Sequence, residues 1–366
     1  MALKVGIVGL TNIGKTTIFN CFSNTKAETS NYSFSTNKSN VGMTKVPDDR
    51  LYELEKYQPT EKIIHTTMEF VDIPGLTKGS SQGQGIGNSF LGDIRNMDAI
   101  IHVIRCFQDE NLPHVEGSIN PYRDIEILNL ELQIKDLESI EKRIEKALKN
   151  AKGGSKDAKK EAELLTVYKD HLENFQNART VELKEEEKAF LGDLFLLTDK
   201  PVMYVCNVDD ESAAGGNQYT EEVKRFVAEN DPEATVLILA AKLEAEIAEL
   251  EEDDQKEFLS DAGLNEPGIN KLIRTAYDLL NLSIFFTIGP KEIRAWTIKK
   301  GATAPEAAGA IHSDLKRGFI RAEVIHYNDF MELKSEAACK ENGKFHIEGK
   351  EYIVQEGDLL HIRFNV

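Results

Sequence analysis

The 366-residue chain has few cysteines, no long apolar run and fewer basic than acidic residues. Its four cysteines are far apart and show neither C-x-x-C spacing nor clustered histidines. This pattern argues against a disulfide framework or a zinc site and predicts reduced, mostly buried thiols. No segment approaches the ~20 apolar residues that cross a bilayer, and the N-terminus lacks a basic region and a cleavage site. We therefore expect a cytoplasmic protein with no membrane partner.

The deficit of positive charge is large, because 44 Lys and Arg face 62 Asp and Glu for a formal net charge of −18. Such a field repels phosphate backbones, which argues against DNA as a partner and against indiscriminate RNA binding. The charge is uneven, however. Residues 282–366 contain as many basic as acidic residues, so residues 1–281 carry the whole excess.

One stretch of the neutral C-terminal part is locally basic. Residues 291–321 hold seven basic and three acidic residues, with Trp296 and Phe319 between them. Aromatic stacking combined with cationic side chains is a common way to build an RNA-binding surface. The alternative is that Trp296 belongs to the core and the lysines only keep the surface soluble.

Short apolar runs predict a parallel sheet that is covered on both faces. Residues 1–120 and 200–281 are expected to form this α/β domain, since the runs alternate with helical or glycine-rich segments. The predicted strands are residues 3–9, 68–73, 99–106, 201–206 and 235–240. An acidic run at 244–257 is interpreted as a solvated helical surface.

Residues 121–199 interrupt this alternation and predict an inserted antiparallel helical hairpin. Two apolar stripes with steps of three or four are separated by Gly153 and Gly154. A projecting hairpin of this kind can present a docking surface, or its charged faces can simply be solvated. The first stripe consists of Ile127, Leu130, Ile134, Leu137, Ile140, Ile144 and Leu148, and the second of Leu164, Leu165, Tyr168, Leu172 and Phe175.

Residues 282–366 predict a small α+β domain with short loops. Its strand-like segments are SIFFTIG, IRAWTI, FIRAEVIHY, KEYIVQ and LLHIRFNV. The length of this segment suits one compact domain.

A phosphate-binding loop is predicted at residues 9–16 (GLTNIGKT), directly after a strand and before a helix. Glycines in such a loop let backbone N–H groups curl around phosphate, Lys15 reaches the β and γ oxygens, and the Thr16 hydroxyl can bind Mg²⁺. Asp72 and Gly75 follow the next strand, where a carboxylate can hold Mg²⁺ and the glycine amide can meet a γ-phosphate. The order and spacing of the two motifs predict nucleoside triphosphate hydrolysis.

Two further segments are candidates to respond to the γ-phosphate. Thr36, in a polar loop between the two motifs, is a candidate second hydroxyl for Mg²⁺, or else an ordinary solvated threonine. The glycine-rich stretch after Gly75 reads as a switch segment. Many GTPases place a glutamine directly after this glycine to orient water, but here the residue is Leu76. His114 is a candidate replacement, or else simply a solvent-exposed histidine.

The base-recognition segment is Asn207, Val208, Asp209 and Asp210, directly after a predicted strand. A guanine site normally needs the pattern N-K-x-D, in which the last residue reads the base. Val208 replaces the lysine, whereas Asp210 keeps the carboxylate. The residues alone therefore leave the choice between ATP and GTP open.

The segments GIVGLTNIGKTTIFN, MEFVDIPGLTKG, QGQGIGNSFL, KEIRAWTIKKGATAPEAAG and DLKRGFIRAEV together closely resemble the YchF subfamily of Obg-like P-loop NTPases. The resemblance covers essentially the whole chain. It implies a nucleotide-binding G domain, a coiled-coil hairpin and a C-terminal TGS domain of β-grasp type. It also implies hydrolysis of ATP in preference to GTP, and binding to the large ribosomal subunit through rRNA and the TGS domain.

The resemblance assigns roles to matching residues. Leu76 matches the hydrophobic replacement of glutamine that marks the group, and His114 matches its proposed catalytic histidine. Asn12 matches an asparagine associated with potassium activation, which makes K⁺ a candidate cofactor beside Mg²⁺, whereas Thr11 departs from the family's usual proline. The residues matched to the phosphate loop are Asn12, Ile13, Gly14, Lys15, Thr16 and Thr17; those matched to Mg²⁺ and the γ-phosphate are Thr16, Thr36, Asp72 and Gly75.

Three functional hypotheses follow from the sequence. The first is a Mg²⁺-dependent ATPase switch with a slow intrinsic rate that binds the ribosome. The second keeps the fold and makes the protein a GTPase, which Asp210 favours. The third is a ribosome-binding or RNA-binding module in which nucleotide turnover is incidental, which Leu76 favours.

Overall fold

The structure is a computed structural model that describes residues 3–24, 39–75 and 87–365. The chain divides into two compact units, each formed by two separate segments. The first contains residues 1–44 and 69–272, and the second contains residues 45–68 and 273–366. The sequence analysis had grouped residues 45–68 with the first portion. The division into domains thus remains a prediction.

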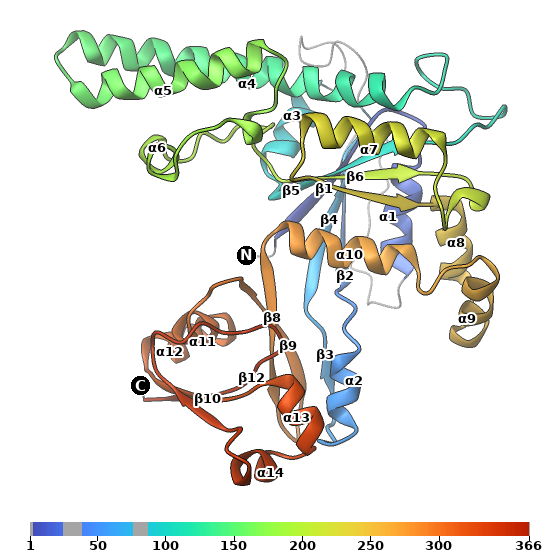
Figure 1. Ribbon diagram of the computed structural model, residues 1–366, viewed down its shortest axis with the longest axis vertical. Coiled ribbons are helices and arrows are strands. Elements are labelled where there is room, and N and C mark those ends of the chain that lie inside the picture. Colours follow the sequence, from blue (N-terminus) through green and yellow to red (C-terminus); the bar gives the residue numbers. More distant parts are fainter. Residues whose placement is uncertain (1–2, 25–38, 76–86, 366) are drawn as a thin grey trace. The chain divides into compact units, whose positions relative to one another are not determined.

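A six-stranded sheet forms the centre of the first unit, and its strands follow the apolar runs of the sequence (Figure 1). The pairs β4–β1, β1–β5, β5–β6 and β6–β7 are all parallel. Every residue of β5 and β6 is buried, as expected for strands covered on both faces. In sheet order the strands are β2 (Asn40–Lys45), β4 (Thr67–Asp72), β1 (Lys4–Val8), β5 (Ala99–Arg105), β6 (Val202–Asn207) and β7 (Thr235–Leu239). The sequence analysis did not predict β2.

Helices and short 3₁₀ turns connect these strands. The last helix, α10, continues from the first unit into the second. The elements are α1 (Lys15–Asn24), α3 (Gly87–Arg95), α4 (Pro121–Lys152), α5 (Lys156–Glu173), η2 (Ala178–Thr180), α6 (Glu185–Leu191), η3 (Asp210–Ser212), α7 (Gln218–Asn230), α8 (Ala241–Glu249), α9 (Glu252–Asp261) and α10 (Gly268–Leu279). None of the described helices is both long enough and apolar enough to cross a membrane.

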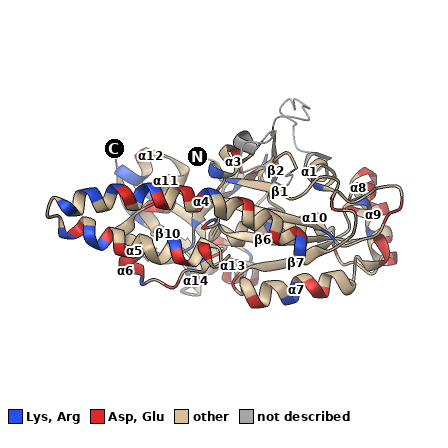
Figure 2. Cartoon of the chain, turned by 90° about the horizontal axis from the view of Figure 1, so that it is seen from above, with Lys and Arg blue, Asp and Glu red and all other residues tan. Residues whose placement is uncertain are grey.

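The predicted helical hairpin is present as α4 and α5, which run side by side (Figure 1). Asn120 caps α4 by accepting a hydrogen bond from the Arg123 N–H, and Ser155 caps α5 in the same way. Charged residues of both signs lie along the two helices (Figure 2). The seam between them buries Ile140, Leu165 and neighbouring apolar residues.

Asp136 fastens the hairpin to the chain that returns from it. It is fully buried on α4, and its carboxylate accepts hydrogen bonds of 2.7 Å from the backbone N–H groups of Leu197 and Thr198 and from the Thr198 hydroxyl. Burial raises the pKa of Asp136, while these three donors lower it.

The predicted apolar stripe of α4 is only partly buried. Ile140 is 1% exposed, but Leu130 is 41% and Leu148 is 50% exposed. In the first half of α4 the buried face is formed by Ile125, Leu128 and Leu132 instead. The reason is that this half packs beside the sheet, so the face that the periodicity pointed to is left without a partner helix.

The acidic run of residues 244–257 occupies α8 and α9, but it is not a uniformly solvated surface. Glu244 is buried and accepts hydrogen bonds from the backbone N–H groups of Gly268 (2.7 Å) and Ile269 (3.1 Å). It therefore satisfies the first turn of α10, where negative charge is favoured.

The second unit is a mixed sheet with α11 packed against it. The alanines of α11 lie against apolar residues of β8, β10 and β12. Phe319 is 7% exposed in this core, so it cannot form part of a stacking surface. In sheet order the strands are β11 (His346–Glu348), β10 (Phe319–Ile325), β12 (Leu359–Phe364), β8 (Leu282–Ile288), β9 (Ile293–Lys299) and β3 (Ile63–Ile64); the helices are α2 (Arg50–Glu55), α11 (Ala304–Ile311), α12 (Ser313–Arg317), α13 (Tyr327–Leu333) and α14 (Glu336–Glu341).

The prediction of a strand at residues 350–355 was wrong. This segment forms only an isolated bridge between Ile353 and Thr303, and the short strand β11 precedes it. A tight loop replaces a strand there because Asp358 draws the chain inward: its carboxylate accepts hydrogen bonds from the Tyr352 hydroxyl and the Gln355 backbone N–H, each at 2.8 Å.

Residues 45–68 are bound firmly to the C-terminal segment of this unit. Strand β3 pairs in parallel with β9, with Ile63 opposite Ile293. Arg50 pairs with both oxygens of Asp48 and reaches Glu356 at 2.6 Å. Glu356 in turn accepts a hydrogen bond from the Ile284 N–H in β8.

Apart from β2 and the 350–355 segment, the predicted architecture is confirmed. The chain forms an α/β unit with a mainly parallel sheet, an inserted antiparallel helical hairpin and a small mixed-sheet unit at the C-terminus. The four cysteines are buried and free.

Candidate nucleotide-binding site

The predicted phosphate loop lies between the end of β1 and the start of α1. Gly14 has φ +95°, and a Cβ at this position would lie 2.3 Å from Nδ2 of Asn207. Only glycine fits there. Asn12 also has a positive φ of 60°, which asparagine tolerates better than most residues. Ile13 is buried, while Thr17 is half-buried in the first turn of α1.

Asn207 braces the loop from the end of β6. Its side-chain amide donates to the carbonyl of Ile13 at 2.8 Å, and its carbonyl oxygen accepts from the Ala241 N–H at 2.9 Å. Both of its polar atoms are thus used within the protein. The sequence analysis assigned Asn207 to the base-recognition segment; its geometry instead links that segment to the phosphate loop.

Lys15 is a buried cation at the start of α1. Its ammonium group donates to the Leu10 carbonyl at 2.5 Å. Burial lowers the pKa of Lys15 to about 8, and the nearby carboxylate of Asp72 offsets part of this effect. A buried lysine at a helix N-terminus is suited to bind an anion such as a phosphate group.

Thr16 and Asp72 meet although they are far apart in the sequence. The Thr16 hydroxyl donates to Oδ2 of Asp72 at 2.9 Å, because parallel pairing sets Ile7 of β1 opposite Asp72 of β4. The other carboxylate oxygen of Asp72 is buried without a hydrogen-bond partner. Burial raises the pKa of Asp72, and the Thr16 hydroxyl and Lys15 oppose this.

These two side chains fit a magnesium ion. A hydroxyl and an unsatisfied carboxylate oxygen are the hard donors that Mg²⁺ prefers, and Mg²⁺ usually takes its remaining ligands from phosphate and water. Within the described ranges no three or more His, Cys, Asp or Glu side chains form a metal-binding cluster. A cation at Thr16 and Asp72 would therefore depend on the oxygens of a bound substrate.

Gly75 lies close to the phosphate loop, as the sequence predicted. A Cβ added at Gly75 would lie 2.7 Å from the Thr11 side chain and 3.1 Å from Nζ of Lys15. Its backbone is therefore adjacent to the lysine that would hold the γ-phosphate. Thr36 and Leu76 lie outside the described residues.

His114 is buried in the loop after β5, with one ring nitrogen hydrogen-bonded and the other close to a carboxylate. Nδ1 accepts a hydrogen bond from the Glu116 N–H at 3.1 Å, and Nε2 lies 2.9 Å from Oδ2 of Asp124. The second contact does not have good hydrogen-bond geometry, since neither atom is satisfied. Burial raises the pKa of Asp124, and Arg123 and His114 lower it.

Two residues that position His114 were not found from the sequence. Asp124 lies in the first turn of α4, and Arg105 ends β5 with 1% of its surface exposed. The Arg105 guanidinium donates to the carbonyls of Phe107 (3.1 Å) and Leu112 (2.7 Å) and so fixes the loop that carries His114. An arginine at the end of an otherwise apolar strand was the available signal.

The base-recognition segment continues from Asn207. Val208 is buried, whereas Asp210 is exposed at the start of η3. Oδ2 of Asp210 lies 3.8 Å from Nζ of Lys242, a residue of α8. The carboxylate that a guanine site would use thus has a cation beside it, although an exposed pair of this kind contributes little energy.

A glycine-bearing loop between strand and helix, a lysine and a hydroxyl in the first helical turn, and a carboxylate at the end of the neighbouring strand define a P-loop nucleoside triphosphatase. A family model described as "50S ribosome-binding GTPase" matches residues 4–147. Residues 282–365 match the model of the YchF-type GTPase C-terminal domain, described as a protein of unknown function.

Known proteins match over the full length. The chain is 48% identical to the "Ribosome-binding ATPase YchF" of Bacillus subtilis and 46% identical to that of Escherichia coli O157:H7, with 100% of each chain covered in both cases. The solved structure of the Schizosaccharomyces pombe YchF GTPase superimposes with a TM-score of 0.88 at 34% identity, covering 99% of this chain and 97% of that one. The chain belongs to the YchF family.

The brace formed by Asn207 generates a prediction. We expect Asn207→Ala to weaken ATP binding by about 5- to 150-fold, because a loss of ~1–3 kcal/mol at a buried amide loosens the phosphate loop. Binding of a fluorescent ATP analogue measures the effect. Asn207→Asp is the matched variant, since it keeps the acceptor for Ala241 and loses only the donor to Ile13. Unchanged affinity in both variants would show that the brace does not shape the site.

Proposed function

We propose that the protein is a Mg²⁺-dependent ATPase whose nucleotide state sets its affinity for the ribosome, and that it acts in the cytoplasm. The observation that carries this proposal is the convergence of Lys15, Thr16, Asp72 and Gly75 at one end of the parallel sheet. The names of the full-length relatives support it. The proposed domains are residues 1–120 with 200–281, 121–199 and 282–366.

Each residue of the site has a chemical part in this proposal. The ammonium group of Lys15 offsets the charge of the β- and γ-phosphates, and the Gly75 N–H donates to the γ-phosphate. Thr16, Asp72 and Thr36 hold Mg²⁺. When bound, Mg²⁺ neutralises charge that develops on the phosphate oxygens. Asn12 is the proposed ligand of an activating K⁺.

The attacking water needs a polar group to orient it, and Leu76 cannot do this. We assign that part to His114. In the described arrangement the side chain is buried, with Nδ1 bonded to the Glu116 N–H and Nε2 facing Asp124, so His114 must move before it can contact water. This requirement accounts for the slow intrinsic rate that we expect.

ATP is the proposed substrate in preference to GTP. Val208 takes the place of the lysine found in guanine sites, and Lys242 lies beside the carboxylate of Asp210. GTP remains the second candidate, because Asp210 is retained and the Schizosaccharomyces pombe structure is described as a GTPase.

The proposed contact with the large ribosomal subunit runs through rRNA and the C-terminal TGS domain. The Arg294 guanidinium lies 4.0 Å from the centre of the half-buried Trp296 ring, within the basic stretch of residues 291–321. Phe319 has no part in this surface, since it is buried. A ribosome-binding module with incidental turnover is the alternative that the next three measurements separate.

We expect Lys15→Ala to abolish ATP hydrolysis and to weaken ATP binding, since the charge opposite the phosphates is lost. His114→Ala is expected to lower turnover at least about tenfold while ATP affinity stays within about twofold, because only the water is affected. Single-turnover hydrolysis and equilibrium binding measure the two quantities. Full turnover in Lys15→Ala would refute the site, and full turnover in His114→Ala would refute the role of the histidine.

We expect ATP to bind at least about tenfold more tightly than GTP, a difference of ~1.4 kcal/mol. In the variant Asp210→Asn the affinity for ATP should stay within about twofold, because the carboxylate makes no adenine-specific contact in this proposal. Competition of ATP and GTP for a fluorescent analogue measures both. Equal or tighter GTP binding that is lost in Asp210→Asn would establish the GTPase alternative.

We expect co-sedimentation with ribosomes to differ at least about threefold between the ATP-bound and ADP-bound protein, since a switch needs differential affinity for its partner. Lys15→Ala should bind ribosomes to the same extent with either nucleotide. Equal binding of the unaltered protein with ATP, with ADP and without nucleotide would favour the module with incidental turnover.

A further inference from the structure

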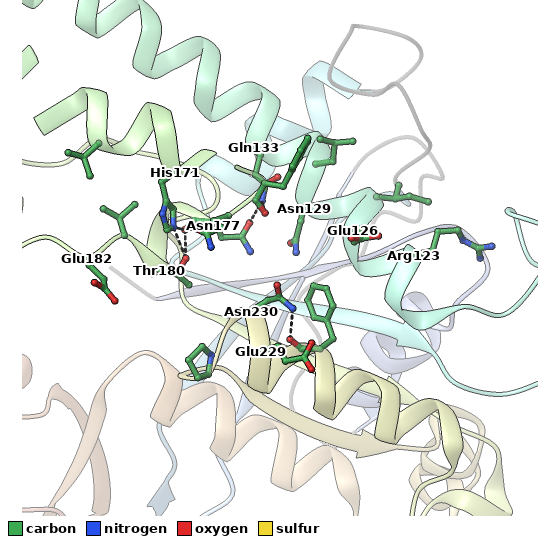
Figure 3. A pocket seen from close by; sticks show the side chains of 18 residues that line it. Arg123, Glu126, Asn129, Gln133, His171, Asn177, Thr180, Glu182, Glu229 and Asn230 are labelled. Carbon is green, nitrogen blue, oxygen red and sulfur yellow. Dashed lines mark hydrogen bonds between the residues drawn. The ribbon is translucent and has the colours of Figure 1, made fainter. Parts of the chain in front are cut away.

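A groove of about 890 Å³ lies between the helical hairpin and α7 (Figure 3). Its walls come from the first half of α4, the end of α5, residues 176–182 and the end of α7. The described residues that line it include no residue of the nucleotide site. The volume lies near the upper end of the range found for ligand pockets, about 300–1,000 Å³.

The groove contains the part of the α4 stripe that has no helical partner. Ile127 and Leu130 line it from α4, and Val167 lines it from α5. Leu130 and Val167 are each 41% exposed, whereas Ile140, further along the same stripe, is buried in the hairpin seam. An apolar seam that opens into a groove is typical of a surface that a partner covers.

Phe175 stands at the rim in a strained backbone conformation. It follows the cap of α5, where the Gln176 N–H donates to the His171 carbonyl and the Phe175 N–H to the Leu172 carbonyl. This turn normally places glycine where Phe175 has φ +59°. Its side chain is 74% exposed, so the strain serves no packing. The Gln133 side chain also donates to the Phe175 carbonyl at 3.2 Å, so the turn holds the exposed aromatic ring at the rim of the groove.

Two pairs of polar side chains in the groove are already hydrogen-bonded within the protein. Gln133 donates to Oδ1 of Asn177 at 2.9 Å, and Nε2 of His171 lies 2.8 Å from the Thr180 hydroxyl. Figure 3 shows these residues gathered on one wall. A ligand that needs many hydrogen bonds would find few there, whereas an α-helix satisfies its own backbone.

The charged residues that line the groove are mainly acidic. Glu126, Glu182 and Glu229 are exposed on its walls. The one basic residue among the lining, Arg123, already pairs with Asp124 at 2.8 Å. An occupant with positive charge on its flanks would complement this rim.

We propose that this groove binds a basic amphipathic α-helix of a partner protein, with Phe175 as the aromatic anchor. The apolar face of the helix would cover Leu130, Val167 and Phe175, and its lysines or arginines would face the glutamates of the rim. The proposal does not depend on the proposed nucleotide and ribosome contacts, and one of the described lining residues, Arg123, also contacts the surroundings of His114.

The test uses the full-length chain and two fluorescein-labelled peptides of about 14 residues, each with leucines on one helical face and either lysines or glutamates on the other. Fluorescence anisotropy should show the basic peptide binding at least about tenfold more tightly than the acidic one. Phe175→Gly should weaken binding of the basic peptide at least about tenfold. The matched control is Phe195→Gly, which changes another exposed phenylalanine with positive φ, outside the groove, and should leave affinity within about twofold.

If Phe175 only stabilised the fold, its replacement would lower the urea concentration at which the chain unfolds. We expect instead that Phe175→Gly unfolds at the same or a higher urea concentration than the unaltered chain, because glycine suits positive φ. Its affinity for the basic peptide should nevertheless fall. Equal peptide binding by Phe175→Gly and Phe195→Gly would overturn the proposal. So would concentration-dependent self-association in sedimentation velocity that disappears in Phe175→Gly, since the occupant would then be a second copy of the chain.

Charge reversal tests the acidic rim. The double variant Glu126→Lys, Glu229→Lys should lose its preference for the basic peptide. Reversal of Glu249 and Glu257, exposed residues of α8 and α9 outside the groove, should keep that preference. An equal loss in both double variants would mean that the peptide responds only to the net charge of the protein, and would overturn the proposal.

Discussion

Parallel pairing of β1 with β4 is the constraint on which the candidate nucleotide site depends. It sets Ile7 opposite Asp72, so the loop after one strand and the carboxylate at the end of the other meet at the same edge of the sheet. Parallel pairing of β5 with β6 in the same sheet fixes the position of Asn207, which reaches the phosphate loop. A register shift of one residue in either pair would turn these side chains to the opposite face.

The same arrangement brings together buried charged side chains, which are costly elsewhere in a protein core. Lys15 and Asp72 are both buried. Burial lowers the pKa of Lys15 and raises the pKa of Asp72, so it favours the neutral form of each side chain. Neither is fully compensated, since one oxygen of Asp72 has no hydrogen-bond partner. Local rules of folding are commonly violated at functional sites, where the rest of the fold supplies the missing stability. The buried and mainly apolar strands β5 and β6 supply that stability here.

Sequence reasoning succeeded where a local pattern determines the structure. Short apolar runs form strands that are buried on both faces of a parallel sheet. Position 14 has a backbone conformation that only glycine adopts without strain, and the sequence has glycine there. It failed where the partner of a residue comes from elsewhere in the chain. The arginine that ends β5 indicates a buried charge, but its contact with the loop of His114 cannot be predicted from the neighbouring residues, and the stripe of α4 cannot reveal which half packs on α5.

Residues 45–68 have a consequence for the order in which the molecule can fold. Strand β3 leaves the ribosome long before β9, its only partner among the described strands, because Ile63 pairs with Ile293. The Asp48 and Arg50 pair likewise waits for Glu356, close to the last residue. The second unit therefore takes part of its structure from a segment that is synthesised long before its partners, and a fragment that begins at residue 282 would leave the edge of β9 open to other chains.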